Sequence, residues 1–296
     1  GAAEYILKSE MRSTDILKIL DETMERAKHC RSIKVNDFFP SGHFDLYEIY
    51  NVAQHRDAPE KYLEEKGVSP RLPMQLYCVE NRNSPQGWLE LTRIADACCA
   101  QTGAQILVAC EKQYEYFVVQ AEKLDEAGQA LLSLLRGKRH VGISTEAENA
   151  SAFMRLLSES AVAQRAGFFF PLRERILYSE LCSYPPLDRE EILTGCRECM
   201  NLIAANRLTA MEGFLARWFD MLARPHAGDI SWAMERCHRM VIFIEEHYER
   251  EFGSPGRQGS ELPDTLARCR EQVQKLMSEH EVKQMKEDLA VQKAVD

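Results

Sequence analysis

The middle of the chain alternates short apolar runs with amphipathic stretches. Four runs have the length and apolar content of buried strands: Gln75–Val79, Ala104–Cys110, Tyr114–Val119 and His140–Ser144. Only three residues separate the second run from the third, so these two strands should pair as a hairpin. Apolar positions at helical spacing predict three helices, over Trp88–Ala100, Leu124–Leu135 and Ser151–Ala166. The pattern therefore predicts the order β-α-β-β-α-β, followed by one further helix.

The last third of the chain is helical in its pattern. Asp188 and Asp229 precede two amphipathic runs as N-cap residues, and a third run spans Leu208–Leu222. A long helix begins at Pro263 and carries a weak apolar stripe, which favours a partly exposed connecting helix over a tight coiled coil. Together the two regions predict an α+β protein, in which a ferredoxin-like βαββαβ domain is followed by a helical region.

The first 30 residues carry the pattern of a strand, a lysine and a helix. Tyr5-Ile-Leu-Lys8 is a short apolar strand with a lysine at its end, and Ser13-Thr14-Asp15 is a cluster of N-cap residues before an amphipathic run. A parallel strand needs neighbours, and none precede this one in the sequence, so we expect the chain to be a fragment. Residues 31–72 have the pattern of a connector with helical pieces, including a short helix around Phe44 and Tyr50.

Composition limits the classes of protein to which the chain can belong. Its 296 residues leave room for about two domains. A hydrophobic content of 45% and a charged content of 28% are typical of a globular protein. No apolar run approaches the ~20 residues that cross a bilayer, so no membrane partner is expected. The net charge of -9 argues against a nucleic-acid surface on this part of the protein.

The ten cysteines do not have the spacing of a disulfide or zinc framework. Most of them stand singly among apolar residues, where cysteine serves as a small hydrophobic residue in a reducing cytoplasm. Cys196-Arg-Glu-Cys199 is a lone CxxC motif within a helical pattern, and no second pair follows at zinc-ribbon spacing. Packing in a core is therefore a better interpretation of this motif than a metal or redox site.

The segment 1–30 resembles the last strand and last helix of a two-component receiver domain. In that family an aromatic residue stands three positions before an invariant lysine, and Tyr5 and Lys8 occupy these two positions. The resemblance implies a phosphorylation switch, in which Lys8 contacts the phosphoryl oxygens on the phospho-accepting aspartate and Tyr5 changes its rotamer. Ser9 replaces the proline that usually follows the lysine. The aspartate and its Mg²⁺ pocket would precede Gly1, so no cofactor is expected in this chain.

The segment 73–171 resembles the degenerate GGDEF-like domain that is inserted in some bacterial transcription regulators. Gly142-Ile-Ser144 matches the usual ending of that family's last strand. An active cyclase needs a glycine pair at the hairpin tip, with carboxylates there and at the end of the first strand to hold two metals. Here the tip is Glu111-Lys112-Gln113, and the first strand ends near Glu80. We therefore expect no catalytic residue, no metal site and no enzymatic activity.

The order of segments resembles that of bacterial response regulators with AraC-type DNA-binding ends. It comprises a receiver end (1–30), a connector (31–72), a GGDEF-like domain (73–171) and a helical region (172–296). The resemblance implies a cytoplasmic, phosphorylation-controlled transcription regulator. Its partners would be a sensor histidine kinase, DNA bound through a missing C-terminal domain, and a second copy in an activated homodimer. Two alternatives remain: a small-molecule sensor built on a catalytically dead GGDEF-like domain, and a divergent cyclase or metal-dependent hydrolase.

Overall fold

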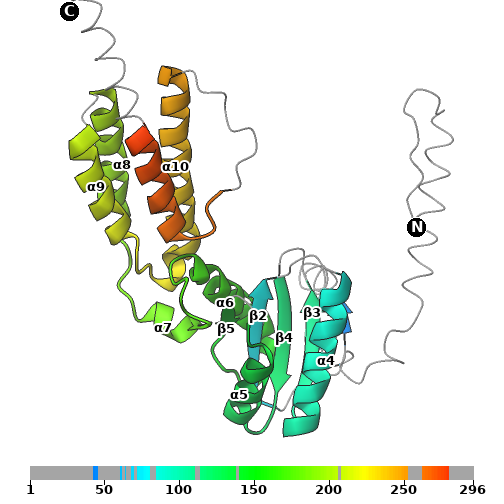
Figure 1. The fold of residues 1–296 in the computed structure, drawn as a ribbon. Helices are drawn as coiled ribbons and strands as arrows, with labels where there is room; N and C mark the ends of the chain where they lie inside the picture. The colour runs from blue at the N-terminus through cyan, green and yellow to red at the C-terminus, as the bar shows by residue number, and fades with distance from the viewer. Residues whose placement is uncertain are drawn as a thin grey trace, which may run out of the picture.

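A computed structural model describes most of the chain from residue 72 onward. The described residues are 43–45, 61, 64, 68–69, 72–80, 85–110, 114–137, 140–205, 208–252 and 262–279. They form a mixed sheet covered by helices, which we call the sheet unit, and a group of helices beside it, the helical unit (Figure 1). The protein is therefore α+β, as expected. Tyr5 and Lys8 lie outside the described residues.

The sheet has six strands in the spatial order β1-β3-β4-β2-β5-β6. They are β1 (His43–Asp45), β2 (Met74–Glu80), β3 (Gln105–Cys110), β4 (Tyr114–Gln120), β5 (Val141–Ile143) and β6 (Arg175–Leu177). The predicted hairpin is formed by β3 and β4, and β2 lies antiparallel between β4 and β5. The two edge strands are parallel to their neighbours, β1 to β3 and β6 to β5. The predicted β-α-β-β-α-β order is found along the chain from β2 to β5.

Helices cover both faces of the sheet. Helices α4 (Pro85–Thr102) and α5 (Leu124–Leu134) pack on one face, and α6 (Phe153–Arg165) packs on the other. Successive residues of a strand point to opposite faces, so Tyr77 lies in the core under α4 and α5 whereas Cys78 lies in the core under α6. Burial on both faces explains why the central strands are continuous apolar runs instead of alternating ones.

The helical unit follows a short 3₁₀ turn and a connecting helix. The 3₁₀ turn η3 (Ala166–Phe168) ends α6, and β6 leads into the short helix α7 (Tyr178–Cys182). The unit itself comprises α8 (Arg189–Ala204), α9 (Leu208–Met221), the 3₁₀ turn η4 (Ala227–Asp229), α10 (Ile230–Phe252) and a helix over residues 266–279. None of the helices in the described part is both long enough and apolar enough to cross a membrane.

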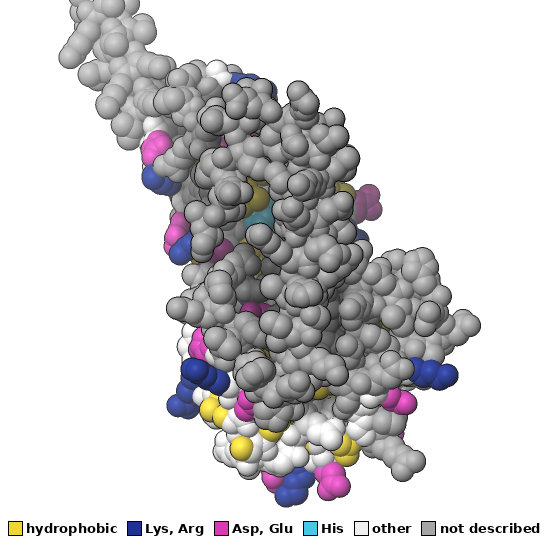
Figure 2. All heavy atoms as spheres, turned by 90° about the vertical axis from the view of Figure 1, so that its right-hand side faces the viewer, with side chains coloured by type: hydrophobic (Ala, Val, Ile, Leu, Met, Phe, Trp, Pro, Cys, Tyr) yellow, Lys and Arg dark blue, Asp and Glu magenta, His cyan; other side chains and the backbone are white. Residues whose placement is uncertain are grey.

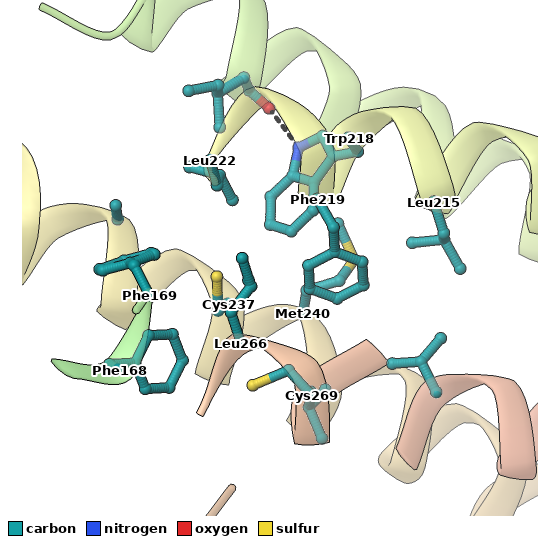
Figure 3. Packing of buried hydrophobic residues seen from close by; sticks show 14 of the residues in the cluster. Phe168, Phe169, Leu215, Trp218, Phe219, Leu222, Cys237, Met240, Leu266 and Cys269 are labelled. Atoms are coloured by element: carbon teal, nitrogen blue, oxygen red, sulfur yellow. Dashed lines mark hydrogen bonds between the residues drawn. The ribbon is translucent and has the colours of Figure 1, made fainter. Parts of the chain in front are cut away.

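The core of the helical unit is built around Trp218 (Figure 3). Its indole N–H donates a hydrogen bond of 3.0 Å to the carbonyl of Ile192 in α8. Gly195 makes this close approach possible, because a Cβ at that position would lie 2.7 Å from the indole ring. Phe219 and Met240 extend the same core from α9 and α10, as the sticks in Figure 3 show.

Two expectations about local structure are wrong. The short helix expected around Phe44 is not found at His43–Asp45, which form β1 because their backbone pairs with β3. Asp229 was expected to cap a helix, but its carboxylate accepts the N–H of Leu187 at 2.9 Å and pairs with Arg189 at 2.6 Å. In both cases a partner distant in the sequence outweighs the local preference. The other predicted cap is confirmed, since Asp188 accepts the N–H of Glu191 at 2.9 Å.

The helix over residues 266–279 is more integrated into the core than a connecting helix would be. It buries one apolar stripe against α9 and α10, formed by Leu266, Cys269, Val273 and Met277. Thr265 caps its start, accepting the N–H of Arg268 at 3.2 Å through its hydroxyl. Arg270 also pairs with Asp220 of α9 at 2.7 Å. The stripe that looked weak in the sequence therefore forms one side of the helical core.

Gly142 in β5 gives a test of the packing between α6 and the sheet. A Cβ at this position would overlap the backbone nitrogen of Gln164 and the backbone carbonyl of Ser160. Backbone atoms cannot rotate away, so Gly142→Ala must push α6 off the sheet. We expect it to lower the free energy of unfolding by about 3 kcal/mol, measured by urea denaturation.

Gly213→Ala is the matched control, because no atom lies within 4 Å of a Cβ at that position in α9. It should leave the stability unchanged or raise it by up to about 1 kcal/mol, as alanine does in exposed helix interiors. Equal unfolding midpoints for Gly142→Ala and the unmodified protein would contradict the described contact between α6 and β5.

Candidate functional site

A groove of about 940 Å³ lies between the sheet unit and the helical unit. One wall is formed by the end of β2, the start of β5 and the turns that follow α6. The other wall is formed by α10 and the start of the helix over residues 266–279. Its volume lies within the range of ~300–1,000 Å³ found for small-molecule sites. We take this groove as the candidate functional site, because it is the place where the two units meet.

The groove includes Glu80, the carboxylate that the sequence placed near the end of the first predicted strand. Glu80 ends β2 there, is exposed, and lies opposite Tyr114 of β4 in the register of the sheet. Glu111, the other carboxylate near this position in the sequence, lies outside the described residues. Within the described residues no group of three or more His, Cys, Asp or Glu side chains could hold a metal ion. Glu80 alone cannot form a two-metal site.

The charges around the groove are of both signs, and several are neutralised by neighbours. Arg173 pairs with Glu180 at 2.8 Å, and Arg268 pairs with Asp264 at 3.1 Å. Arg165 donates to the hydroxyl of Ser231 at 2.9 Å, which ties the end of α6 to the start of α10. Elsewhere on the surface, along one edge of the face drawn in Figure 2, acidic and basic side chains also lie next to one another. The groove therefore has no strong preference for one sign of ligand charge.

His140 lies at the sheet side of the groove, directly before β5. Its Nδ1 is 2.6 Å from the carbonyl oxygen of Arg173, and its ring lies against Gly167 in η3. A carbonyl can only accept a hydrogen bond, so the hydrogen must be on Nδ1 for this bond to form. The φ angle of His140 is 23°, and it is the only positive φ of a non-glycine residue in the described part. Such a backbone is strained for a residue with a Cβ, so its surroundings must hold it in place.

His238 of α10 lies at the helical side of the same groove. Its Nε2 is 2.9 Å from the carbonyl oxygen of Pro263, and the ring of Phe168 meets its ring edge to face at 5.3 Å between centroids. Phe168 directly follows Gly167, the residue that His140 contacts. One 3₁₀ turn therefore touches a histidine of each unit.

The thiols of the helical unit are buried or half-buried, and burial raises their pKa. Cys199 is fully buried in the helical core, and Cys196 of the same CxxC motif packs against that core half-buried. Burial raises the pKa of the Cys199 thiol to about 12, and the neighbouring thiol of Cys196 acts in the same direction. A thiol with so high a pKa is a poor metal ligand and a poor nucleophile. The geometry agrees with the interpretation of this motif as core packing.

Apart from Glu80, the sequence did not single out the residues on which the contacts of the groove depend. His140, Gly167 and His238 belong to different segments, and their contacts depend on how the sheet unit and the helical unit pack. No spacing in the sequence could have signalled them. The two predicted switch residues, Tyr5 and Lys8, lie outside the described residues, so their role stays a prediction.

No family model matches the chain, and no curated protein matches it significantly.

Buried thiols generate a prediction about pH. The pKa of Cys269 is raised to about 12 by burial, with a smaller effect of the Asp264 charge, and an unfolded chain would ionise this thiol near 9. Above about pH 9 the folded protein therefore keeps a proton that the unfolded chain loses. The contribution of this thiol to stability is complete below about pH 9 and declines as the pH rises towards 12. We expect Cys269→Ala to flatten this decline, measured by urea denaturation at pH 8 to 11.

Cys182→Ala is the control, because Cys182 is exposed. It should change the slope of stability against pH much less than Cys269→Ala does, because Cys182 is only a secondary cause, after burial, of the raised pKa of Tyr178. Identical slopes for Cys269→Ala and the unmodified protein would contradict the burial of this thiol in the folded state.

Proposed function

We propose that this chain is the regulatory and signal-transmitting part of a phosphorylation-controlled bacterial transcription regulator, a two-component response regulator. Its sheet unit would be a degenerate GGDEF-like domain that has no catalytic role. A sensor histidine kinase would be its upstream partner, and DNA would be bound by AraC-type helix-turn-helix units after the helical region. The protein would act in the cytoplasm, as a homodimer when activated.

One observation carries this proposal: a single hydrogen-bonded sheet connects β1, near the start of the described part, to the helical unit. At one edge β1 pairs in parallel with β3, with His43 opposite Val108. At the other edge β6 pairs in parallel with β5 and leads directly into α7 and the helical unit. The sheet behaves as a rigid body, so a displacement of β1 also moves β6. β6 is the edge strand that leads into the helical unit. This is the arrangement expected of a transmitting domain.

The arrangement of strands supports a ferredoxin-like, GGDEF-like assignment of the sheet unit. Strands β3, β4, β2 and β5 are neighbours in that order and all antiparallel, and α4 and α5 cover one face. This is the order that a split βαβ domain requires. The match of Gly142 to the family's strand ending has a physical basis, because α6 packs directly on that glycine.

The proposed mechanism is a two-state switch. Phosphate on an aspartate outside this chain would engage Lys8, Tyr5 would reorient, and the face of the following helix would change. The connector and the sheet unit would then release the DNA-binding ends to dimerise. Two linked ends bind paired half-sites at a high effective concentration, so a modest coupling produces tight DNA binding.

Lys8→Ala tests this mechanism in the full-length regulator. Phosphorylation should still occur, but the gain in DNA affinity on phosphorylation should fall by about tenfold, because the ammonium no longer meets the phosphoryl group. DNA binding before and after phosphorylation measures this gain by fluorescence anisotropy. Lys18→Ala, in the predicted helix that follows, is the control and should keep the full gain. An unchanged gain in the Lys8→Ala variant would exclude the proposed switch.

The coding sequence on both sides of this segment gives an independent test. We expect about 100 residues upstream with an acidic pair and a strand-end aspartate, and about 100 basic residues downstream with two helix-turn-helix patterns. A start codon just before Gly1 and a stop codon just after Asp296 would reject the response-regulator proposal.

A second candidate function is small-molecule sensing, and the groove favours it. Its volume of about 940 Å³ would accept a nucleotide-sized ligand, and it includes the strand end at Glu80. A thermal-shift panel of nucleotides with and without magnesium tests this function. A ligand present at 100 times its Kd should stabilise the protein by about 2.7 kcal/mol. A flat panel would leave transmission as the function of the sheet unit.

A further inference from the structure

The 3₁₀ turn η3 is held from both sides by histidines of the two units. Gly167 lies so close to His140 that a Cβ at this position would overlap the imidazole ring. Phe168 contacts His238 edge to face, with 5.3 Å between ring centroids. His238 in turn holds the carbonyl of Pro263 at 2.9 Å, two residues before Thr265, which caps the last described helix. These contacts form a continuous path from the start of β5 to the start of the helix over residues 266–279.

We propose that this path is the coupling element of the protein. We call it the histidine relay, and it consists of His140, Gly167, Phe168, His238 and Pro263. A shift of β5 moves His140 and therefore η3, because the ring and the glycine leave no space between them. The movement of η3 then presses Phe168 against His238. His238 in turn moves the Pro263 carbonyl, which lies just before the last described helix. Coupling of this kind requires packed side chains that cannot deform continuously.

The strained backbone of His140 supplies the relay with two arrangements. Its φ of 23° is disfavoured for a residue with a Cβ, and the bond to the Arg173 carbonyl together with the contact to Gly167 holds it there. If β5 and β6 slide apart, the Arg173 carbonyl moves away and His140 relaxes to an ordinary negative φ. The ring then leaves Gly167, and η3 loses its support on the sheet side. A two-state element is what distinguishes a coupling device from a static contact.

The relay deepens the proposed function and rests on it, because the relay is the place where a signal would leave the sheet unit. It also explains why the groove has charges of both signs. The two histidines in its walls hold backbone carbonyls across short distances, and the ion pairs around them fix the segments that carry those carbonyls. The relay requires no ligand, no phosphate and no DNA, so it can be tested on this chain alone.

Hydrogen exchange at the last helix tests the relay. Gly167→Ala displaces the His140 ring without touching the helix over residues 266–279. We expect it to raise the exchange rate of the first amides of that helix about tenfold, in the range typical of coupling between sites. The amide of Cys269 is a suitable probe, because it donates to the Thr265 carbonyl at 3.0 Å. Amides of α8 report global unfolding in the same spectra and should keep their rates.

Gly213→Ala is again the matched control, and it should leave the amides of the last helix unchanged. The decisive comparison is made in a His238→Ala background, which interrupts the path beyond Phe168. There Gly167→Ala should change the exchange of the last helix by less than about twofold, since coupled mutations are not additive whereas independent ones are. A tenfold effect that persists in this background would overturn the relay, as would a Gly167→Ala variant whose last helix exchanges like that of Gly213→Ala.

Phe168→Leu provides the test if Gly167→Ala does not fold. Leucine keeps an apolar side chain in the core but removes the edge-to-face contact with His238. We expect the same rise in exchange at the Cys269 amide, again abolished in the His238→Ala background. If the Cys269 amide of Phe168→Leu exchanges at the rate found in the unmodified protein, the relay is overturned. Either result is independent of phosphorylation, so failure of the relay and failure of the response-regulator proposal are separate outcomes.

Discussion

Helix α6 is the element on which the rest of the structure depends, because it belongs to both cores. Its first half buries Phe153, Leu156 and Leu157 against the sheet. Its end and the first residue of η3 place Ala163 and Ala166 in the core of the helical unit. Gly142 lets the backbone of α6 lie directly on β5, so the helix cannot slide without disturbing the sheet. The two units therefore share a helix. A linker alone would not couple their positions in this way.

Buried polar groups fix the segments around α6. Glu159 is 7% exposed, and its carboxylate accepts from the backbone and hydroxyl of Thr145 and pairs with Arg155. Asp229 is 4% exposed, and it ties the start of α8 to the start of α10 through Leu187 and Arg189. Removing one partner of such a group would leave a buried charge uncompensated, which is strongly unfavourable. These networks fix the segment between β5 and α6 and the starts of α8 and α10.

The sequence predicted those parts of the fold that local pattern determines. Burial on both faces gives the central strands their unbroken apolar runs, so β2 to β5 were found in the right order. The strand at His43–Asp45 was missed because three residues carry no periodicity, and only pairing with β3 makes them a strand. The groove was missed for a similar reason. His140 and Gly167 are 27 positions apart in the printed sequence, and only the packing of α6 brings them together.

If the sheet unit is the degenerate GGDEF-like domain that we propose, it can still have a role as a rigid body. In a cyclase the end of β2 must stay open for a nucleotide and its metals. Here Glu80 is the only carboxylate that the described part of β2 brings to that end, and the helical unit forms the opposite wall of the groove. In the proposed domain this strand end has no catalytic role, so it can support contacts that an active site would exclude. The histidine relay lies in this space, and it connects the start of β5 with the start of the helix over residues 266–279. Transmission through this contact is a physically consistent role for the sheet unit under the proposed function.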